Sequence, residues 1–249
     1  MIRPLRLLVK AAITVVLSGL SLPVPMGVAW AAEGFSSKLE LALNGGDAQT
    51  LTELVPPESL SGLQRRYDRF SKEFPDARWT VRPLATLDDG RRTLEVFVRG
   101  ERESDGLQYQ LEASQRLAVR IEAGRLMDQE LLMEQSLLRS GKSSLPVTLD
   151  IPDAVLTGSR YDVDVIFDQP LGNAVVAGGL LSLTPEQVLN QIRPNLTLEP
   201  MGGGGLFKTV QAPQRPGAQT WAAMLVHPDG VVTVTKRVRV VNQRRDLAP

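Results

Sequence analysis

The side chains of this chain that could act chemically on a substrate are few. The sequence holds one histidine and no cysteine, which excludes thiol nucleophiles, thiolate metal sites and disulfides. The histidine, His227, stands in HPDG, whose composition is typical of a surface turn. No G-x-S-x-G or H-E-x-x-H segment is present, so the common hydrolase and metalloprotease chemistries have no support. We therefore assign no catalytic residue, no metal ligand and no cofactor.

Two glycine-containing segments share their composition with phosphate-binding loops. The first, MGGGGLFKT at residues 201–209, has Phe207 rather than glycine before Lys208, and strands are expected on both of its sides. We interpret it as a hairpin loop. The second, SGKSS at residues 140–144, has Ser136 at the position where the motif requires its first glycine, and its composition indicates a linker.

Acidic residues alternate with apolar ones in YDVDVIFD, residues 161–168. Asp162, Asp164 and Asp168 are candidate oxygen ligands for calcium. Acids two residues apart on a strand are equally typical of a solvent-exposed face, with the residues between them turned toward a core. We favour the exposed face.

The densest basic run lies near the C-terminus, in KRVRVVNQRRDLAP, and its members are Lys236, Arg237, Arg239, Arg244 and Arg245. Such a run is a candidate contact for anionic lipid headgroups or for an acidic protein surface, in either case sensitive to salt. The alternative is a solvated edge strand, because lysine and arginine also protect strand edges from aggregation.

Residues 1–31 have the composition of an export signal. Three basic residues precede an apolar run, prolines interrupt it, and small residues precede Ala32, which together predict a cleaved Sec-type signal peptide. The alternative is an uncleaved N-terminal membrane anchor, because about twenty residues could just cross a bilayer. Without this segment 25 basic residues (28 minus 3) face 28 acidic ones, so the balance of charge predicts no nucleic-acid partner.

The remaining chain begins with helical spacing and continues with alternation. Apolar residues three and four apart predict an amphipathic helix over residues 59–74, after two shorter helices, the second capped by Asp47. Period-two alternation bounded by glycine turns then predicts an antiparallel meander of strands at residues 79–87, 93–102, 107–121 and 126–138.

Helices carrying LALNGGDAQTLTELV, an amphipathic helix and a long meander together resemble the NTF2-like cone, also called the SnoaL-like or cystatin-like fold, over about residues 35–139. The resemblance implies a curved antiparallel sheet that packs one face on the helices. Some members of that family are isomerases or dehydratases with an acidic base and a hydrogen-bond donor inside the cone. On that resemblance the pocket candidates are Tyr67, Tyr109, Asp128 and Glu130.

After SGKSS the sequence predicts about seven short strands and one helical turn, as in an immunoglobulin-like β-sandwich. The predicted fold class is therefore α+β, an NTF2-like curved sheet with N-terminal helices followed by an all-β immunoglobulin-like sandwich. The predicted domain organisation is a signal peptide (1–31), the NTF2-like domain (32–139), a linker (140–144), the sandwich (145–243) and a basic tail (244–249).

Thin catalytic chemistry in two interaction-type modules favours an exported, non-catalytic scaffold or protein-binding module at the periplasmic face of a membrane. The expected partner is a protein, with a peripheral membrane contact as a further expectation. The chain also resembles exported bacterial proteins, cyanobacterial ones among them, which implies a thylakoid lumen as the other compartment. The alternative function is a small-molecule binder or an isomerase-like or dehydratase-like enzyme that uses the cone interior.

Overall fold

The computed structural model describes residues 30–141, 145–169, 174, 176–190, 192 and 194–248, with no side-chain detail for residues 30–33 and 58. Nearly all of the predicted signal peptide, and residues 142–144 of SGKSS, lie outside these ranges. The helices are α2 (Trp30–Gly45), α3 (Ala48–Leu54), α4 (Pro57–Glu73), α5 (Pro185–Asn190) and the short 3-10 helix η1 (Arg244–Asp246). The strands are β1 (Arg78–Leu84), β2 (Arg92–Ser104), β3 (Leu107–Glu122), β4 (Arg125–Gly141), β5 (Val147–Asp150), β6 (Ala154–Leu156), β7 (Arg160–Phe167), β8 (Val176–Leu183), β9 (Glu199–Met201), β10 (Gly205–Gln211), β11 (Gly217–His227) and β12 (Gly230–Val241).

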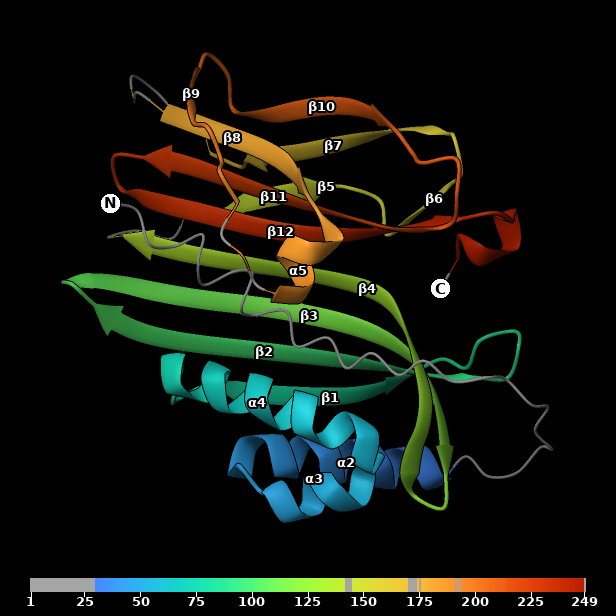
Figure 1. The fold of residues 1–249 in the computed structure, drawn as a ribbon. Coiled ribbons are helices and arrows are strands. Elements are labelled where there is room, and N and C mark those ends of the chain that lie inside the picture. Colours follow the sequence, from blue (N-terminus) through green and yellow to red (C-terminus); the bar gives the residue numbers. More distant parts are fainter. Residues whose placement is uncertain are drawn as a thin grey trace. The chain divides into compact units, whose positions relative to one another are not determined.

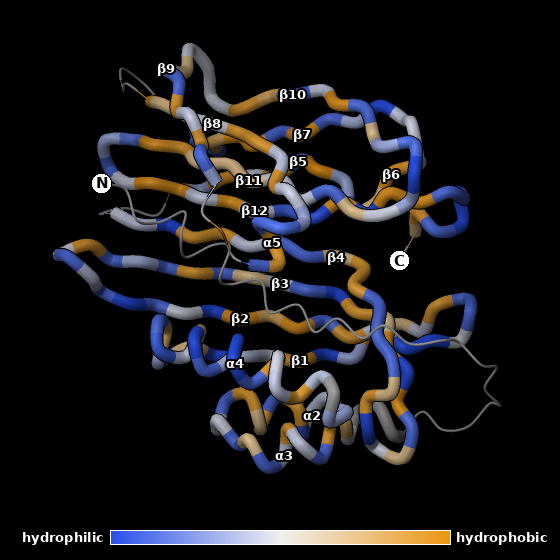
Figure 2. The backbone as a smooth tube through the Cα atoms, in the orientation of Figure 1, coloured by the Kyte–Doolittle hydropathy of each residue, from blue (hydrophilic) through white to orange (hydrophobic). Residues whose placement is uncertain are grey.

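The strands form two sheets (Figure 1). The larger has nine strands, in the order β1-β2-β3-β4-β12-β11-β8-β9 with β6 attached to β12, and the smaller has the order β10-β7-β5. Hydrophilic and hydrophobic segments alternate along many of these strands (Figure 2), as expected for strands whose two faces meet different surroundings. The meander that alternation predicted is present as β1 to β4, with Asp105-Gly106 and Ala123-Gly124 turns in which all four residues have positive φ.

The predicted fold class is wrong. Of the residues that the structure describes, strands make up 53% and helices 22%, and the meander is part of a nine-stranded sheet rather than the wall of an NTF2-like cone. The reason lies in β4, which does not stop at Leu138 but continues to Gly141 and pairs with β12 from Gly230↔Gly141 to Arg237↔Glu134. Strands that composition assigned to two separate folds, a cone and an immunoglobulin-like sandwich, therefore share one ladder of hydrogen bonds.

Two glycines allow this pairing at the point where the sequence suggested a linker. Gly141 lies at φ 136°, and a Cβ atom on it would collide with the carbonyl oxygen of Asp229. A Cβ atom on Gly230 would collide with the carbonyl oxygen of Ser140. The glycine of SGKSS is therefore the last residue of β4 and permits a close approach of two backbones.

The described residues divide into two compact units, and several strands contribute to both. The N-terminal unit comprises residues 30–100 and 114–132, and the C-terminal unit comprises residues 101–113 and the described residues from 133 onward. The predicted domains are continuous ranges of sequence, whereas each of these units combines separate ranges. The predicted boundaries remain predictions.

In the N-terminal unit α4 packs its predicted apolar stripe on β1. The Phe70 ring meets the Trp79 ring edge-on, with 5.2 Å between centroids, and stacks on Phe74 at 5.6 Å. Asp47 caps α3 as predicted, since its side chain accepts hydrogen bonds from the backbone amides of Gln49 and Thr50 at 3.0 and 3.1 Å.

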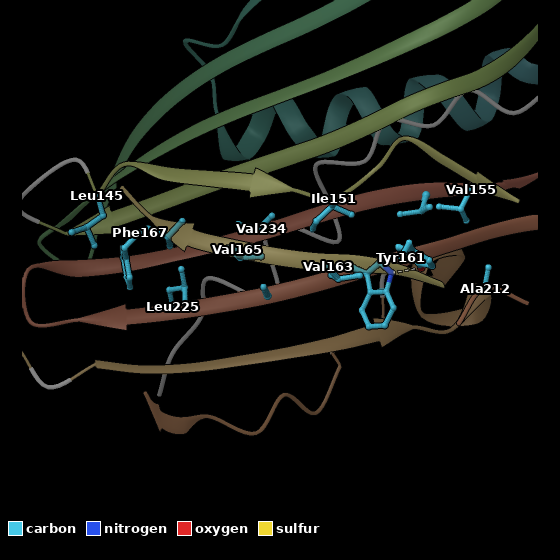
Figure 3. Close-up of a cluster of buried hydrophobic side chains, with 14 of the residues drawn as sticks. Leu145, Ile151, Val155, Tyr161, Val163, Val165, Phe167, Ala212, Leu225 and Val234 are labelled. Carbon is cyan, nitrogen blue, oxygen red and sulfur yellow. Dashed lines mark hydrogen bonds between the residues drawn. The ribbon is translucent and has the colours of Figure 1, made fainter. Parts of the chain in front are cut away.

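In the C-terminal unit one hydrophobic core lies between the two sheets (Figure 3). β7 contributes alternate residues to it, and Val163 and Val165 are fully buried. The large sheet contributes side chains of β11 and β12 to the same core, among them Leu225 and Val234. Burial of each such side chain contributes about 2 kcal/mol before the entropy of ordering the chain is subtracted.

Candidate functional site

The structure gives each pocket candidate of the sequence a structural contact. The Tyr67 hydroxyl donates to the carbonyl of Leu43 at 2.6 Å. The buried Tyr109 ring lies under the guanidinium of Arg102, 4.7 Å from its centroid. Asp128 accepts from the backbone amide of the next residue at 2.9 Å. Glu130, exposed, pairs with Arg91 at 2.7 Å.

Glu130 belongs to a small ionic network at the β1–β2 turn. Arg91 also pairs with Asp89, Nε to Oδ2, at 2.7 Å. Although partial burial raises the pKa of Asp89, hydrogen bonds from the backbone and side chain of Arg91 outweigh it and lower that pKa. The pKa of Arg91 is raised, because its bonds to both carboxylates outweigh desolvation. These charges connect the β1–β2 turn to β4, and screening keeps the contribution of such surface pairs small.

The five basic candidates do not form one surface. β12 lies between β11 and β4, so it is not the edge strand that its composition suggested. Lys236 and Arg239 are buried, and the Lys236 ammonium pairs with the carboxylate of Asp153. Arg237 is half-buried, and Arg244 and Arg245 in η1 are exposed. Because β12 is a central strand, Lys236 and Arg239 of the basic run are buried within the fold.

The three-stranded sheet has one face in the core and one face outside. On β7, Tyr161, Val163, Val165 and Phe167 point into the core, which leaves Asp162 and Asp164 on the outer face. The exposed-face interpretation of YDVDVIFD is therefore confirmed. Asp150 of β5 stands directly opposite Asp164, so the outer face sets two carboxylates side by side. The described residues contain no group of three or more histidine, cysteine, aspartate or glutamate side chains arranged to hold a metal ion.

The outer face also carries an exposed aromatic ring. Phe207 of β10 is 64% exposed and stands opposite Asp164. Its neighbour on the same face, Thr209, donates its hydroxyl to Asp162 Oδ1 at 2.6 Å. An exposed ring beside carboxylates combines apolar area with negative charge.

The edge of β10 is open. Two bonds fix the phase of the β10–β7 ladder, Phe167 N to Gly204 O at 2.7 Å and Ala212 N to Ser159 O at 2.8 Å. Bonded pairs recur at every second residue of an antiparallel ladder, so the even-numbered residues of β10 face β7 and the odd-numbered ones turn their N–H and C=O outward. Among the residues that the structure describes, no hydrogen bond is made by the outward backbone groups of Phe207 or Thr209.

On the core side, β7 and β10 make side-chain contacts with β11. The indole of Trp221 donates to the Tyr161 hydroxyl at 2.9 Å, and that hydroxyl donates to Gln219 Oε1 at 2.7 Å. Burial raises the pKa of Tyr161, although the Trp221 bond works in the opposite direction. The Lys208 ammonium lies 5.6 Å from the Trp221 ring centroid. These contacts attach β7 and β10 to β11 on the core side of the small sheet.

The composition of MGGGGLFKT predicts a hairpin loop and does not single out Phe207 or Thr209. The glycines do not join paired strands, because β9 belongs to the large sheet and β10 to the small one. Gly202, Gly203 and Gly204 are exposed, and a Cβ atom on any of them would meet open space. Period-two alternation could have identified Phe207 and Thr209. They alternate with Leu206, Lys208 and Val210, so they lie on the opposite face of the strand.

Comparison with known proteins adds one match. Residues 142–241, which include the whole outer face, match the family described as "Domain of unknown function (DUF8623)". No curated protein matches the chain. In the part of the chain that the structure describes, no helix has both the length and the apolar character needed to span a membrane.

Proposed function

We propose that this chain is an exported, non-catalytic binding protein whose C-terminal unit docks a protein partner. The observation that carries the proposal is the open edge of β10 beside an exposed aromatic ring. Exposed strand edges pair readily with other chains, and native proteins usually cover or shorten them. A seven-residue edge with Phe207 on its outer face is therefore a docking site by its chemistry.

Two further features support this function. The signal-like composition of residues 1–31 favours export to the periplasm or a comparable lumen. The pocket candidates Tyr67, Tyr109 and Glu130 are engaged in structural contacts, and the cone that an isomerase-like activity requires is not the observed fold. Binding is therefore the better supported function, and its partner is a protein rather than a nucleic acid.

The test is to tag the C-terminus of the full chain, fractionate the producing cells and cross-link before purification. We expect a processed chain in the exported fraction, in a stoichiometric complex with one protein, and we expect Phe207→Ala to release that protein. The exposed Leu189→Ala, in the same unit, is the matched control and should retain it. An unprocessed cytosolic chain, or a solitary chain that carries a small molecule, would contradict the proposal.

A further inference from the structure

Resting on the proposed function, we infer that the partner docks as an extended segment that adds to the β10 edge and carries lysine or arginine on the side of the outer face. The backbone geometry specifies an extended segment. Phe207 and Thr209 each turn an N–H and a C=O outward, in the repeat that a pairing strand matches. Main-chain bonds of this kind supply affinity without regard to sequence, so selectivity must come from side chains.

The charge of the outer face specifies the side chains. Asp150, Asp162 and Asp164 lie together on it, and Arg160 is the basic residue at its far end. Asp150 and Asp164 lie directly opposite each other on neighbouring strands. Like charges in this arrangement repel each other and are destabilising. A cation placed above them removes that repulsion, so positive charge in the partner is favoured twice.

The distances suit long basic side chains. An added strand would lie two strand spacings from β7, about 10 Å. Lysine and arginine can cross β10 over that span, with their stems along the Phe207 ring and their charged ends at Asp162 or Asp164. The ring face also attracts cations directly. Short side chains would not reach these carboxylates, and acidic ones would be repelled by them.

The same charges disfavour a second copy of this chain as the occupant. Two β10 edges joined together would place the acidic outer faces of both copies in one continuous sheet. The resulting arrangement would multiply repulsion instead of relieving it. A basic segment of a different protein is therefore the occupant that the charges favour.

The probe is a display library of random twelve-residue peptides, selected on the full chain and then counter-selected on Thr209→Pro. Proline at this position removes an outward N–H and leaves the β7 ladder, which runs through Lys208 and Val210, in place. We expect peptides that depend on this edge, enriched in lysine and arginine at every second position. The matched variant Thr209→Val keeps the N–H, loses the bond to Asp162 and should retain these peptides.

Affinities of the selected peptides then test the side chains. We expect Phe207→Ala to weaken binding about tenfold or more, as truncation of a central aromatic residue does. Asp162→Asn with Asp164→Asn should weaken it about tenfold at low salt and about twofold in 0.5 M NaCl, since screening removes most of a surface charge contact. Asp88→Asn, an exposed acid of the other unit, should change nothing.

The outcomes separate the inference from the proposed function. Edge-dependent peptides without an excess of basic residues, or no edge-dependent peptides at all, would overturn the inference. So would a dimer of the chain that Thr209→Pro dissociates, because a second copy would then occupy the edge. A cellular complex that persists in Thr209→Pro would overturn the inference and leave the proposed function standing. Selected basic peptides without any cellular complex would contradict the proposed function instead.

Discussion

The strands β1 and β10 each end a sheet, yet their outward backbone groups meet different surroundings. On β1, Asn44 of α2 donates to the carbonyl of Trp79 at 2.8 Å and accepts from its amide at 2.9 Å. Glu40, one helical turn earlier, accepts from the amide of Val81 at 2.7 Å. On β10 the corresponding groups of Phe207 and Thr209 have no hydrogen-bonding partner among the described residues. One edge is thus closed by a helix of the chain itself, whereas the other is open among the described residues.

Edge protection in this protein is local and depends on single side chains. Asn44 and Glu40 sit four residues apart on α2, which places both on the same side of the helix. Each supplies what a neighbouring strand would have supplied. Nothing in the part of α5 or the loops that the structure describes does the same for β10.

The largest effect is expected from opening the closed edge. Asn44→Ala leaves both backbone groups of Trp79, a residue only 6% exposed, without their bonds, and should lower the free energy of unfolding by about 2 kcal/mol. Urea unfolding monitored by tryptophan fluorescence measures the loss. An opened edge should also promote concentration-dependent self-association, which light scattering detects.

Asn242→Ala, at an exposed position after β12, is the control for Asn44→Ala and should leave both measurements unchanged. An Asn44→Ala chain with unchanged stability and no self-association would show that the edge of β1 does not need its helix. Closing the edge of β1 would then make no contribution to the stability of the protein.

A smaller effect is expected at the second contact of the same edge. Glu40→Ala removes the acceptor of the Val81 amide and should cost about 1 kcal/mol, whereas Glu40→Gln retains an acceptor and should cost about half of that. Amide hydrogen exchange at Val81 should accelerate in the same order. Equal losses for both substitutions would mean that the charge of Glu40, and not its acceptor, stabilises β1.

Asp47 tests whether the helices beside the edge contribute through their own caps. The Thr50 hydroxyl, with the backbone amides of Thr50 and Gln49, lowers the pKa of Asp47 in the folded state. A lowered pKa stabilises the fold above the ordinary aspartate pKa, and this contribution is lost as the pH falls through the lowered value. Asp47→Ala should therefore reduce Tm by a few degrees at pH 7 and by less near pH 3.

Asp47→Asn provides the control for this cap, because asparagine caps helices about as well as aspartate and does not titrate. Its Tm, relative to the unmodified chain, should improve as the pH falls. A loss in Asp47→Ala that stays constant between pH 7 and pH 3 would show that the carboxylate charge has no part in the cap.

Local pattern predicted much of this fold, and the limits of that prediction have a physical cause. Alternation located β1 to β4 and β7, and helical spacing located α4, because both report which side of an element is buried. Alternation does not report which strand lies beside which. The pairing of β4 with β12 depends on long-range contacts near Gly141 and Gly230 that no local window contains.

The candidate site shows the same limit. The acidic side of β7 followed directly from YDVDVIFD, since the apolar residues between the acids had to face a core. The availability of charges did not follow. Lys236 and Arg239 are buried because β12 is central, whereas Phe207 is exposed because β10 is an edge. Position within a sheet, which composition does not encode, decides whether a side chain can meet a partner.

The smallest effect on stability is expected from changing the open edge. Thr209→Pro should alter the free energy of unfolding by less than about 0.5 kcal/mol beyond the effect of Thr209→Val, because the outward N–H that proline removes has no partner to lose among the described residues. Urea unfolding of both variants, followed by tryptophan fluorescence, measures this difference. A large additional loss in Thr209→Pro would mean that this N–H already has a partner within the chain. Both edges would then be closed, and the contrast that assigns β10 to binding would disappear.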